Sequence, residues 1–251
     1  MADSSKRSST VRARAAGSRR PARQSSAAGK PRAAAQALLP QGDVTLTDRA
    51  YAELEELIVT LQLPPGTALS ELVLAKRLDI GRTPIREALQ RLSRDGLVNI
   101  LARRGVLVSE IDLRAQLRLL EVRRELERLM APGAAERATS EQRAQFSEIA
   151  AGMRRAAEKS DDLLFMRLDH QFNTLISAAS RNEFASRAMG LMHGLSRRFW
   201  YQHYKEAADL PLAARLHADV AEAIAERRVD AAGAASDSLI DYIESFARST
   251  L

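Results

Sequence analysis

The stretch RTPIREAL, residues 82–89, decides the fold of the N-terminal part of the chain. In and just after it, apolar residues recur at the three- and four-residue spacing of a helix with one buried face: Ile85, Ala88, Leu89 and Leu92. Thr83 is a suitable N-cap, and Pro84 suits the first helical position, where its missing N–H costs nothing. The spacing therefore predicts a short helix that starts after Thr83 and ends at Asp95-Gly96.

The residues around this helix complete a winged helix-turn-helix near residues 47–110. A helical stripe from Thr47 stops at Leu63-Pro64-Pro65-Gly66, because proline removes N–H donors and glycine permits the turn. Ser70 can cap a second helix over 71–78, and Asp79-Ile80-Gly81 is a tight turn into the third. Two strand-like runs follow, 97–101 and 106–109, around a basic tip, and such a pair makes a wing.

The exposed face of the helix that begins near residue 82 carries side chains that suit DNA. A helix-turn-helix lays its second helix in the major groove, where arginine matches guanine and glutamine matches adenine. First-turn N–H groups at Thr83 suit a phosphate, and the basic wing tip suits a neighbouring minor groove. The predicted DNA-binding residues are Arg82, Thr83, Arg86, Gln90, Arg103, Arg104 and Gly105. Their order favours a sequence-specific DNA-binding protein.

Composition agrees with a mainly α protein in a reducing compartment. Of the 251 residues, 45% are hydrophobic and 4% aromatic, and the absence of cysteine excludes disulfides and Cys-ligated zinc. We expect a cytoplasmic protein that does not span a membrane, since no apolar run approaches the required length. We do not expect an enzyme, because no nucleophile–base pair, phosphate-binding glycine loop or complete metal site is recognisable.

Positive charge is concentrated at the N-terminus. The net charge is +6, but residues 1–40 hold nine Lys or Arg against one acid, a sum of +8 that leaves about −2 for the rest. Residues 1–42 are predicted to form a disordered basic arm. Two interpretations stay open for it: a non-specific phosphate contact, and a solvated tail without a role.

The remaining sequence predicts an all-helical bundle. Helices are expected over 112–138, 140–158, 161–179, 183–205, 211–227 and 230–248. The expected caps are Asp112, Ser140, Asp161 and Asp230, and Pro132-Gly133 is expected to break or kink the first helix. The predicted domains are thus a DNA-binding domain over 43–110 and an effector-binding and dimerisation domain over 111–251.

Residues 47–110 resemble the winged helix of GntR-family transcription regulators. The resemblance rests on LPPGTALSE (63–71), RTPIREAL (82–89) and GLV (96–98). The family commonly has serine before the first arginine, where this chain has Gly81. The stretch LEVRRELE (120–127), with the later Asp169, Asn173 and His217, is similar to the FCD-type helical effector domain of the FadR branch.

That second resemblance implies a pocket for a small carboxylate, often held through a divalent metal with one Asp and three His ligands. Asp169 and His217 match two metal ligands, but Asn173 stands at one histidine position and Leu239 at the other. Only a register slip of two residues would bring Asp241 there instead. By the same resemblance, Arg123 is the carboxylate anchor.

Three alternatives stay open for this domain: a zinc or nickel site at Asp169 and His217, a metal-free pocket, and no small ligand. The metal-free pocket is supported by Asp169 and Asn173, which at i and i+4 share one helix face. The bland interpretation pairs Asp169 with an arginine and makes His217 an interior histidine. His193, His203 and residues 199–201 are expected to be core or dimer contacts.

These observations predict a homodimeric regulator, a repressor rather than an activator, that binds a palindromic double-stranded DNA operator. Two half-sites multiply the specificity of two recognition helices. A small carboxylate metabolite in the helical domain would modulate its operator affinity. The alternative is an architectural or constitutive DNA-binding protein without an effector.

Overall fold

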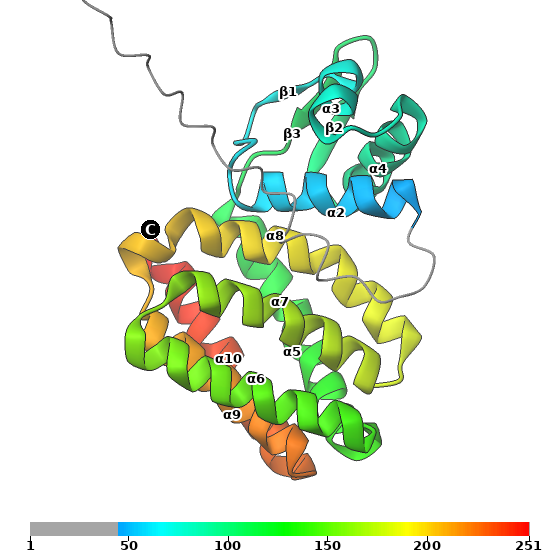
Figure 1. Cartoon of the computed structure of the whole chain (residues 1–251). Helices are drawn as coiled ribbons and strands as arrows, with labels where there is room; N and C mark the ends of the chain where they lie inside the picture. The colour runs from blue at the N-terminus through cyan, green and yellow to red at the C-terminus, as the bar shows by residue number, and fades with distance from the viewer. Residues whose placement is uncertain (1–44, 251) are drawn as a thin grey trace, which may run out of the picture.

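The computed structural model describes residues 45–250 and contains, over that range, nine helices and a three-stranded sheet (Figure 1). Its first part comprises α2 (Leu46–Val59), β1 (Ala68–Leu69), α3 (Glu71–Leu78), α4 (Arg82–Arg94), β2 (Val98–Leu101) and β3 (Gly105–Val108). Six helices follow: α5 (Leu113–Arg137), α6 (Ser140–Lys159), α7 (Asp162–Ala179), α8 (Glu183–Ala207), α9 (Leu210–Ala225) and α10 (Val229–Ser249). The mainly α fold is confirmed. The predicted arm, residues 1–42, lies outside the described residues.

Helix α2 forms the base of the winged helix. It starts where the Thr45 hydroxyl accepts a hydrogen bond from the N–H of Asp48 at 3.1 Å. Its inner face packs on the leucines of α4 in one apolar core, through Ala50, Leu54, Leu57 and Ile58. These four belong to the stripe that the sequence predicts from Thr47, whose fifth member, Leu61, lies beyond the end of the helix with φ of 58°.

The turn between α3 and α4 sets the direction of α4. Asp79 ends α3 in the left-handed conformation, with φ of 55°. Helix α4 then begins at Arg82 with Gly81 as N-cap, so the predicted cap at Thr83 is wrong. The first four N–H groups of a helix have no intrahelical partner, and Pro84 therefore fits the third position as well as the first. The predicted buried stripe of α4 is confirmed.

The wing is a hairpin of β2 and β3, and β1 pairs with the other edge of β3. The tip needs two left-handed residues, Arg103 with φ of 62° and Gly105 with φ of 92°. The sequence predicts the hairpin but not β1, because two residues are too few to carry an alternating pattern.

The six helices of the second part bury a core rich in alanine. Helix α6 packs along α9, and α10 packs against α5 and α9. The predicted helix ranges agree with the observed bounds to within two residues. No helix between residues 45 and 250 has the length and apolar character that crossing a membrane would require.

The observed helix caps, and the course of α5 through Pro132, differ in part from the sequence-based predictions. Asp112 and Asp161 cap their helices as predicted. Thr139 rather than Ser140 caps α6, because it forms a capping box with Gln142. Arg228 precedes α10, and Asp230 lies in its first turn instead, where a carboxylate is favourable to the helix dipole. The expected break at Pro132-Gly133 is wrong: α5 continues to Arg137, since complete burial of the neighbouring alanines offsets the proline penalty.

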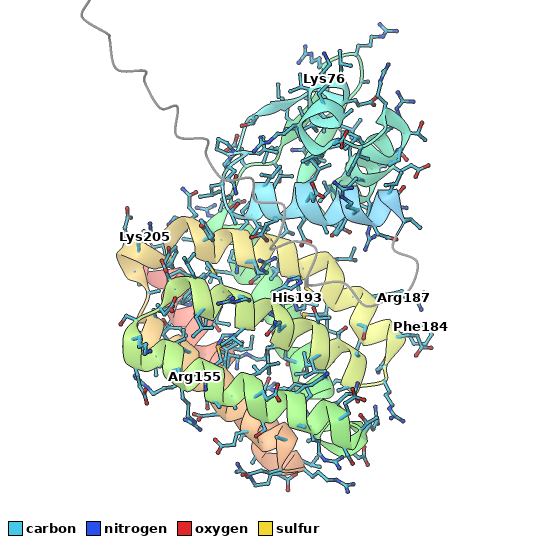
Figure 2. All side chains as sticks on the ribbon, in the orientation of Figure 1. Lys76, Arg155, Phe184, Arg187, His193 and Lys205 are labelled. Atoms are coloured by element: carbon cyan, nitrogen blue, oxygen red, sulfur yellow. The ribbon has the colours of Figure 1, made fainter. Side chains whose placement is uncertain are left out.

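Helix α8 lies between the two parts of the molecule, with α2 packed against it on the side of the winged helix (Figure 1). Phe184 and Lys205 mark its two ends (Figure 2). Leu195 packs against the core of the winged helix. The buried guanidinium of Arg198 donates to the carbonyl oxygens of Ser109, at 2.9 Å, and Glu110, at 3.2 Å. Helix α8 thereby holds the segment that connects β3 to α5.

Candidate functional site

Arg82 and Arg86 lie on the outer, solvent-exposed face of α4, and both are near one acid on α3, Glu71. The side chains of Arg82 and Arg86 are 63% and 55% exposed. The Nε and Nη2 groups of Arg86 donate to the two carboxylate oxygens of Glu71 at 2.9 and 2.8 Å, and Arg82 Nη2 lies 3.6 Å from the same acid. The hydrogen bond from Arg86 lowers the pKa of Glu71. Glu71 is therefore hydrogen-bonded to Arg86 and lies close to Arg82.

The other predicted DNA-facing residues are also exposed. Thr83 and Gln90 lie on the solvent side of α4, and no side chain caps the first turn of that helix. The hairpin tip, residues 103–105, is exposed as well. Hydrogen-bond donors and positive charge are thus exposed at three places: the outer face of α4, the N-terminus of α4 and the tip of the hairpin.

A cavity of about 50 Å³ lies inside the helical part. Five helices contribute to its wall, and several of the lining side chains are aromatic. It is lined by Gln116, Arg123, Phe165, Met166, Asp169, Asn173, His193, Ser196, Arg197, Phe199, Trp200, Ala213, His217, Tyr242, Ile243 and Phe246. The four residues predicted for effector binding, Arg123, Asp169, Asn173 and His217, therefore share one cavity. This volume accommodates a ligand of only a few non-hydrogen atoms unless side chains in the wall move.

The cavity floor is a hydrogen-bonded set around Asp169. His217 Nε2 lies 3.2 Å from Asp169 Oδ1, and Asn173 Nδ2 donates to the same oxygen at 2.9 Å. Burial would raise the pKa of Asp169, but the hydrogen bond and charge of His217 and the charge of Arg197 lower it to about 2. The other ring nitrogen of His217 lies 2.8 Å from the carbonyl oxygen of Ala213. The Asp169 carboxylate and the Ala213 carbonyl oxygen thus hold the ring of His217 through its two nitrogens.

These residues do not fit the metal site that the resemblance implies. His217 Nε2, the atom that a metal would bind, lies 3.2 Å from the Asp169 carboxylate, and the Asn173 amide donates to the same acid. Leu239 is buried in the apolar core, 2% exposed. Over residues 45–250, no three His, Asp or Glu side chains come together as a metal site.

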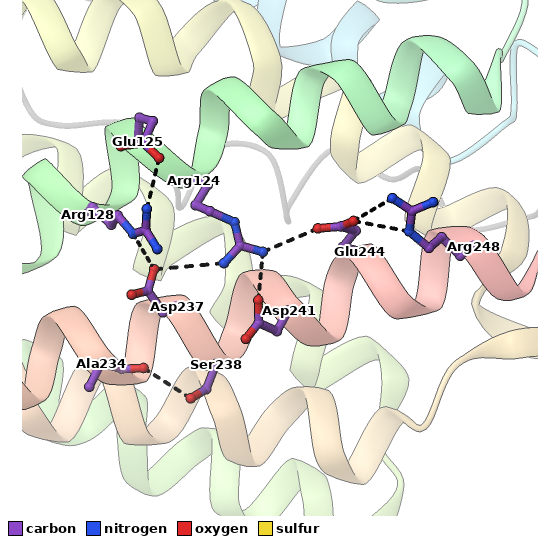
Figure 3. A network of polar contacts seen from close by, with 9 residues as sticks. All are labelled: Arg124, Glu125, Arg128, Ala234, Asp237, Ser238, Asp241, Glu244 and Arg248. Carbon is purple, nitrogen blue, oxygen red and sulfur yellow. Dashed lines mark hydrogen bonds and ion pairs between the residues drawn. The ribbon is translucent and has the colours of Figure 1, made fainter.

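The register slip that would supply Asp241 as a ligand is excluded by its position. Asp241 lies on the outer face of α10, where its carboxylate is 2.7 Å from Arg124 of α5 (Figure 3). Neighbouring pairs extend this contact: Arg124 also meets Glu244 at 3.3 Å, and Arg128 meets Asp237 at 2.7 Å. Asp241 therefore belongs to an ion-pair ladder that joins α5 to α10.

Arg123 reaches the cavity but already has protein partners. Its side chain pairs with Glu127 one turn along α5, and its Nη1 donates to the Ser196 hydroxyl at 2.7 Å. Ser196 also accepts from Gln116 Nε2, at 3.1 Å. Three of the five N–H groups of Arg123 are therefore engaged, and two are left for a further acceptor.

The sequence did not single out the α8 residues of the cavity as a ligand site. Arg197 Nε and Trp200 Nε1 are buried donors without a hydrogen-bond partner, and both line the cavity. His193 also lines it, and burial and the charge of Arg123 lower the pKa of His193 to about 3, so this ring is neutral. The signal available was spacing: positions 193, 197 and 200 repeat at four and three residues. Phe199 and Trp200 pack in apolar clusters as expected, while His203 stacks on Phe199.

Comparisons with known proteins decide the family. The model described as bacterial regulatory proteins, gntR family, matches residues 46–108, and the FCD domain model matches residues 118–242. The chain belongs to the GntR family. Its GntR domain covers α2 to β3, and its FCD domain contains most of the cavity wall. A GntR-family protein with these two domains is a DNA-binding transcriptional regulator, and the family and these relatives are described as regulators.

Individual relatives agree with this assignment. The HTH-type transcriptional repressor RspR of Escherichia coli is 28% identical over 187 residues, 74% of this chain and 82% of RspR. An uncharacterized HTH-type regulator in an unstable DNA locus of Streptomyces ambofaciens is 44% identical over 62 residues, which are 25% of this chain and 26% of that protein. The structure of E. coli McbR/YncC superimposes with a TM-score of 0.70 at 20% identity, covering 82% of this chain and 99% of that one. This last likeness supports the fold.

Proposed function

We propose that this GntR-family regulator belongs to the FadR branch and acts as a homodimeric repressor that releases its operator when a small carboxylate enters the FCD cavity. In this proposal residues 43–110 bind DNA, and residues 111–251 bind the effector and dimerise. The carrying observation is the pair of unpartnered buried donors, Arg197 Nε and Trp200 Nε1, in a cavity beside Arg123. Buried donors without an acceptor are destabilising, and a carboxylate would satisfy them.

The charge balance of the cavity supports an anion. Arg123 and Arg197 bring two positive charges to the wall, and Asp169 is the acid among the lining residues. In this arrangement Asp169 and Asn173 hold His217, while Arg123, Arg197 and Trp200 face the ligand. Because Asp169 and His217 satisfy each other, the carboxylate needs no metal to bridge it to the protein.

A thermal-shift screen tests the cavity and the role of metal together. Formate, acetate, lactate and pyruvate are compared in the presence of EDTA, zinc or nickel. A ligand that binds only the folded protein at 100 times its Kd adds about 2.7 kcal/mol of stability, which for a chain of this size is about 5–10 °C in Tm. The same shift with EDTA as with metal is expected. A shift that requires zinc or nickel contradicts the metal-free site, and a flat screen favours the constitutive DNA-binding protein.

The cavity residue is tested against a neighbour on the same helix. Arg123→Gln removes the anchor, whereas Arg124→Gln alters an arginine of the outer ladder that does not line the cavity. Each variant is compared with its own ligand-free Tm. The carboxylate shift is expected to disappear in Arg123→Gln and to persist in Arg124→Gln. Equal shifts in both variants would move the site away from Arg123.

On the DNA side, Arg82, Arg86 and Gln90 would read bases, Thr83 would contact a phosphate, and residues 103–105 would enter a minor groove. Exposure of this whole set supports the assignment. One recognition helix covers few base pairs, so a dimer on a palindromic operator supplies the required specificity. The name of the RspR relative as a repressor supports the same sign of regulation here. Selection of duplexes from a random pool, followed by sedimentation of the complex, tests palindromic symmetry and the two-to-one stoichiometry.

A further inference from the structure

Helix α8 is a wall shared by the cavity and the GntR domain. His193 and Trp200 face the cavity, while Leu195 packs against the winged-helix core. Between them, a Cβ at Gly194 would meet Leu97 at 2.8 Å and a carboxylate oxygen of Glu55 at 3.1 Å. The backbone of α8 therefore approaches the winged helix as closely as packing permits, and a small displacement of one side is felt on the other.

Arg197 stands at the point where the two surfaces of this wall meet. Its side chain is 15% exposed. Its Nη2 lies 3.3 Å from a carboxylate oxygen of Glu56 on α2, and its Nε lies 4.0 Å from Asp169 Oδ2 on the cavity floor. One guanidinium thus faces an acid in each domain, and its Nε–H has no hydrogen-bond partner.

The two contacts of Arg197 differ in strength. Glu56 is 55% exposed, so water screens its pair with Arg197, and the contact contributes little by itself. Asp169 is 14% exposed and ionised, and its attraction acts in a less polar surrounding. Burial raises the pKa of the nearby Glu55, an effect that the charge of Arg197 opposes. The position of this guanidinium therefore affects the electrostatics of α2 as well as those of the cavity.

We infer that Arg197 transmits occupancy of the FCD cavity to the GntR domain. An anion bound in the cavity accepts from the unpartnered Nε–H of Arg197 and draws the guanidinium inward. The Glu56 contact is then lost, and α2 is less firmly held on α8. A ligand shifts an equilibrium only through contacts that differ between two states, and the exchange of Glu56 for the ligand is such a difference. The inference rests on the proposed function for its ligand, but the Arg197 link is testable without one.

The first experiment is a double-mutant cycle that uses no effector. Asp169→Asn, Glu56→Gln and the double variant are compared for their Kd on a duplex that the wild-type protein selects from a random pool. If both acids compete for Arg197, their effects on Kd do not multiply, and we expect a deviation of at least about threefold. Glu53→Gln is the matched control, because Glu53 lies on the same helix but pairs with Arg49. Its cycle with Asp169→Asn should deviate by less than about twofold.

Multiplicative effects in both cycles would overturn the inference. If Asp169→Asn does not fold, Arg197→Gln takes its place, and the effect of Glu56→Gln on Kd is then expected to disappear. Persistence of that effect in the Arg197→Gln background contradicts the link equally well.

The second experiment adds pyruvate and measures the Kd for DNA in the wild type, Glu56→Gln and Glu53→Gln. We expect pyruvate to weaken DNA binding at least about fivefold in the wild type and in Glu53→Gln, and less than about twofold in Glu56→Gln. The thermal shift with pyruvate should persist in all three proteins, since Glu56 does not line the cavity. A full response in Glu56→Gln refutes the role of Arg197. No thermal shift in any protein refutes pyruvate as the effector, and the ligand-free cycle then decides on Arg197.

Discussion

Arg86 of α4 and Arg123 of the cavity are both paired with carboxylates, yet they differ in access to water. The side chain of Arg86 is 55% exposed and meets Glu71 at the surface, whereas that of Arg123 is 9% exposed and meets Glu127 inside the protein. An exposed pair adds at most about 1 kcal/mol, so a nucleic acid can replace the acid readily. A buried pair is strongly destabilising to break. The first arrangement suits exchange of partners, and the second suits a preformed site.

The largest loss of stability is expected when the buried contact between His217 and Asp169 is removed. In His217→Leu, Asp169 loses its main partner, and an uncompensated buried charge costs about 3–5 kcal/mol of unfolding free energy. Urea unfolding measures it. Adding Asp169→Leu to the same protein should recover most of the loss, because an apolar pair replaces the ion pair. A double variant no more stable than His217→Leu would contradict this account.

The exposed face should show the opposite balance between stability and binding. Arg86→Ala should weaken DNA binding by about 1–3 kcal/mol and blur discrimination at one base position. Its unfolding free energy should change by less than about 1 kcal/mol. Arg94→Ala, an exposed arginine at the other end of α4, is the control and should leave base preference unchanged. Unchanged preference in Arg86→Ala would place the recognition surface elsewhere.

Acid should affect the buried region before the exposed one. The pKa of His193 is about 3 in the folded protein, against 6.5 for a free ring, so between these values the unfolded chain binds more protons. The contribution of the neutral His193 ring to the unfolding free energy is thus complete above pH 6.5 and is lost as the pH falls toward 3. The loss at pH 5 is up to about 2 kcal/mol. Urea midpoints at pH 7 and 5, in a buffer free of carboxylates, should fall further for the wild type than for His193→Gln. Equal falls would show that His193 is not the responsible group.

The smallest effect is expected at Glu71, the acid that pairs with Arg82 and Arg86. Glu71→Gln frees Arg82 and Arg86 and removes a negative charge that faces the duplex. Affinity for unrelated DNA should rise a few-fold, or up to about 1 kcal/mol. The ratio of the affinity for the selected duplex to that for unrelated DNA should therefore decrease. Filter binding at several salt concentrations measures both quantities. A loss of affinity for all sequences would show instead that Glu71 serves by orienting the arginines.

Periodic features of the sequence predicted most of the fold. The leucine stripe of α4 and the basic hairpin required only local patterns, and both are present. The uninterrupted α5 was missed, because the packing that offsets Pro132 comes from residues distant in the chain. For the cavity, the α7 and α9 positions followed from the family resemblance, but Arg197 did not. Its importance depends on Glu56 and Asp169, which lie 141 and 28 positions away, and a single sequence does not indicate that they meet.

The close approach of α8 to the winged helix at Gly194 also bears on how such regulators diversify. Residues that shape the cavity and residues that seat the GntR domain alternate on the same turns of one helix. A substitution on α8 that changes the cavity is therefore expected to change the packing of the GntR domain as well. A chimera that joins the GntR domain of another regulator to this FCD domain is expected to pack poorly at α8. Exchanging residues 194–198 together with the GntR domain should restore the packing.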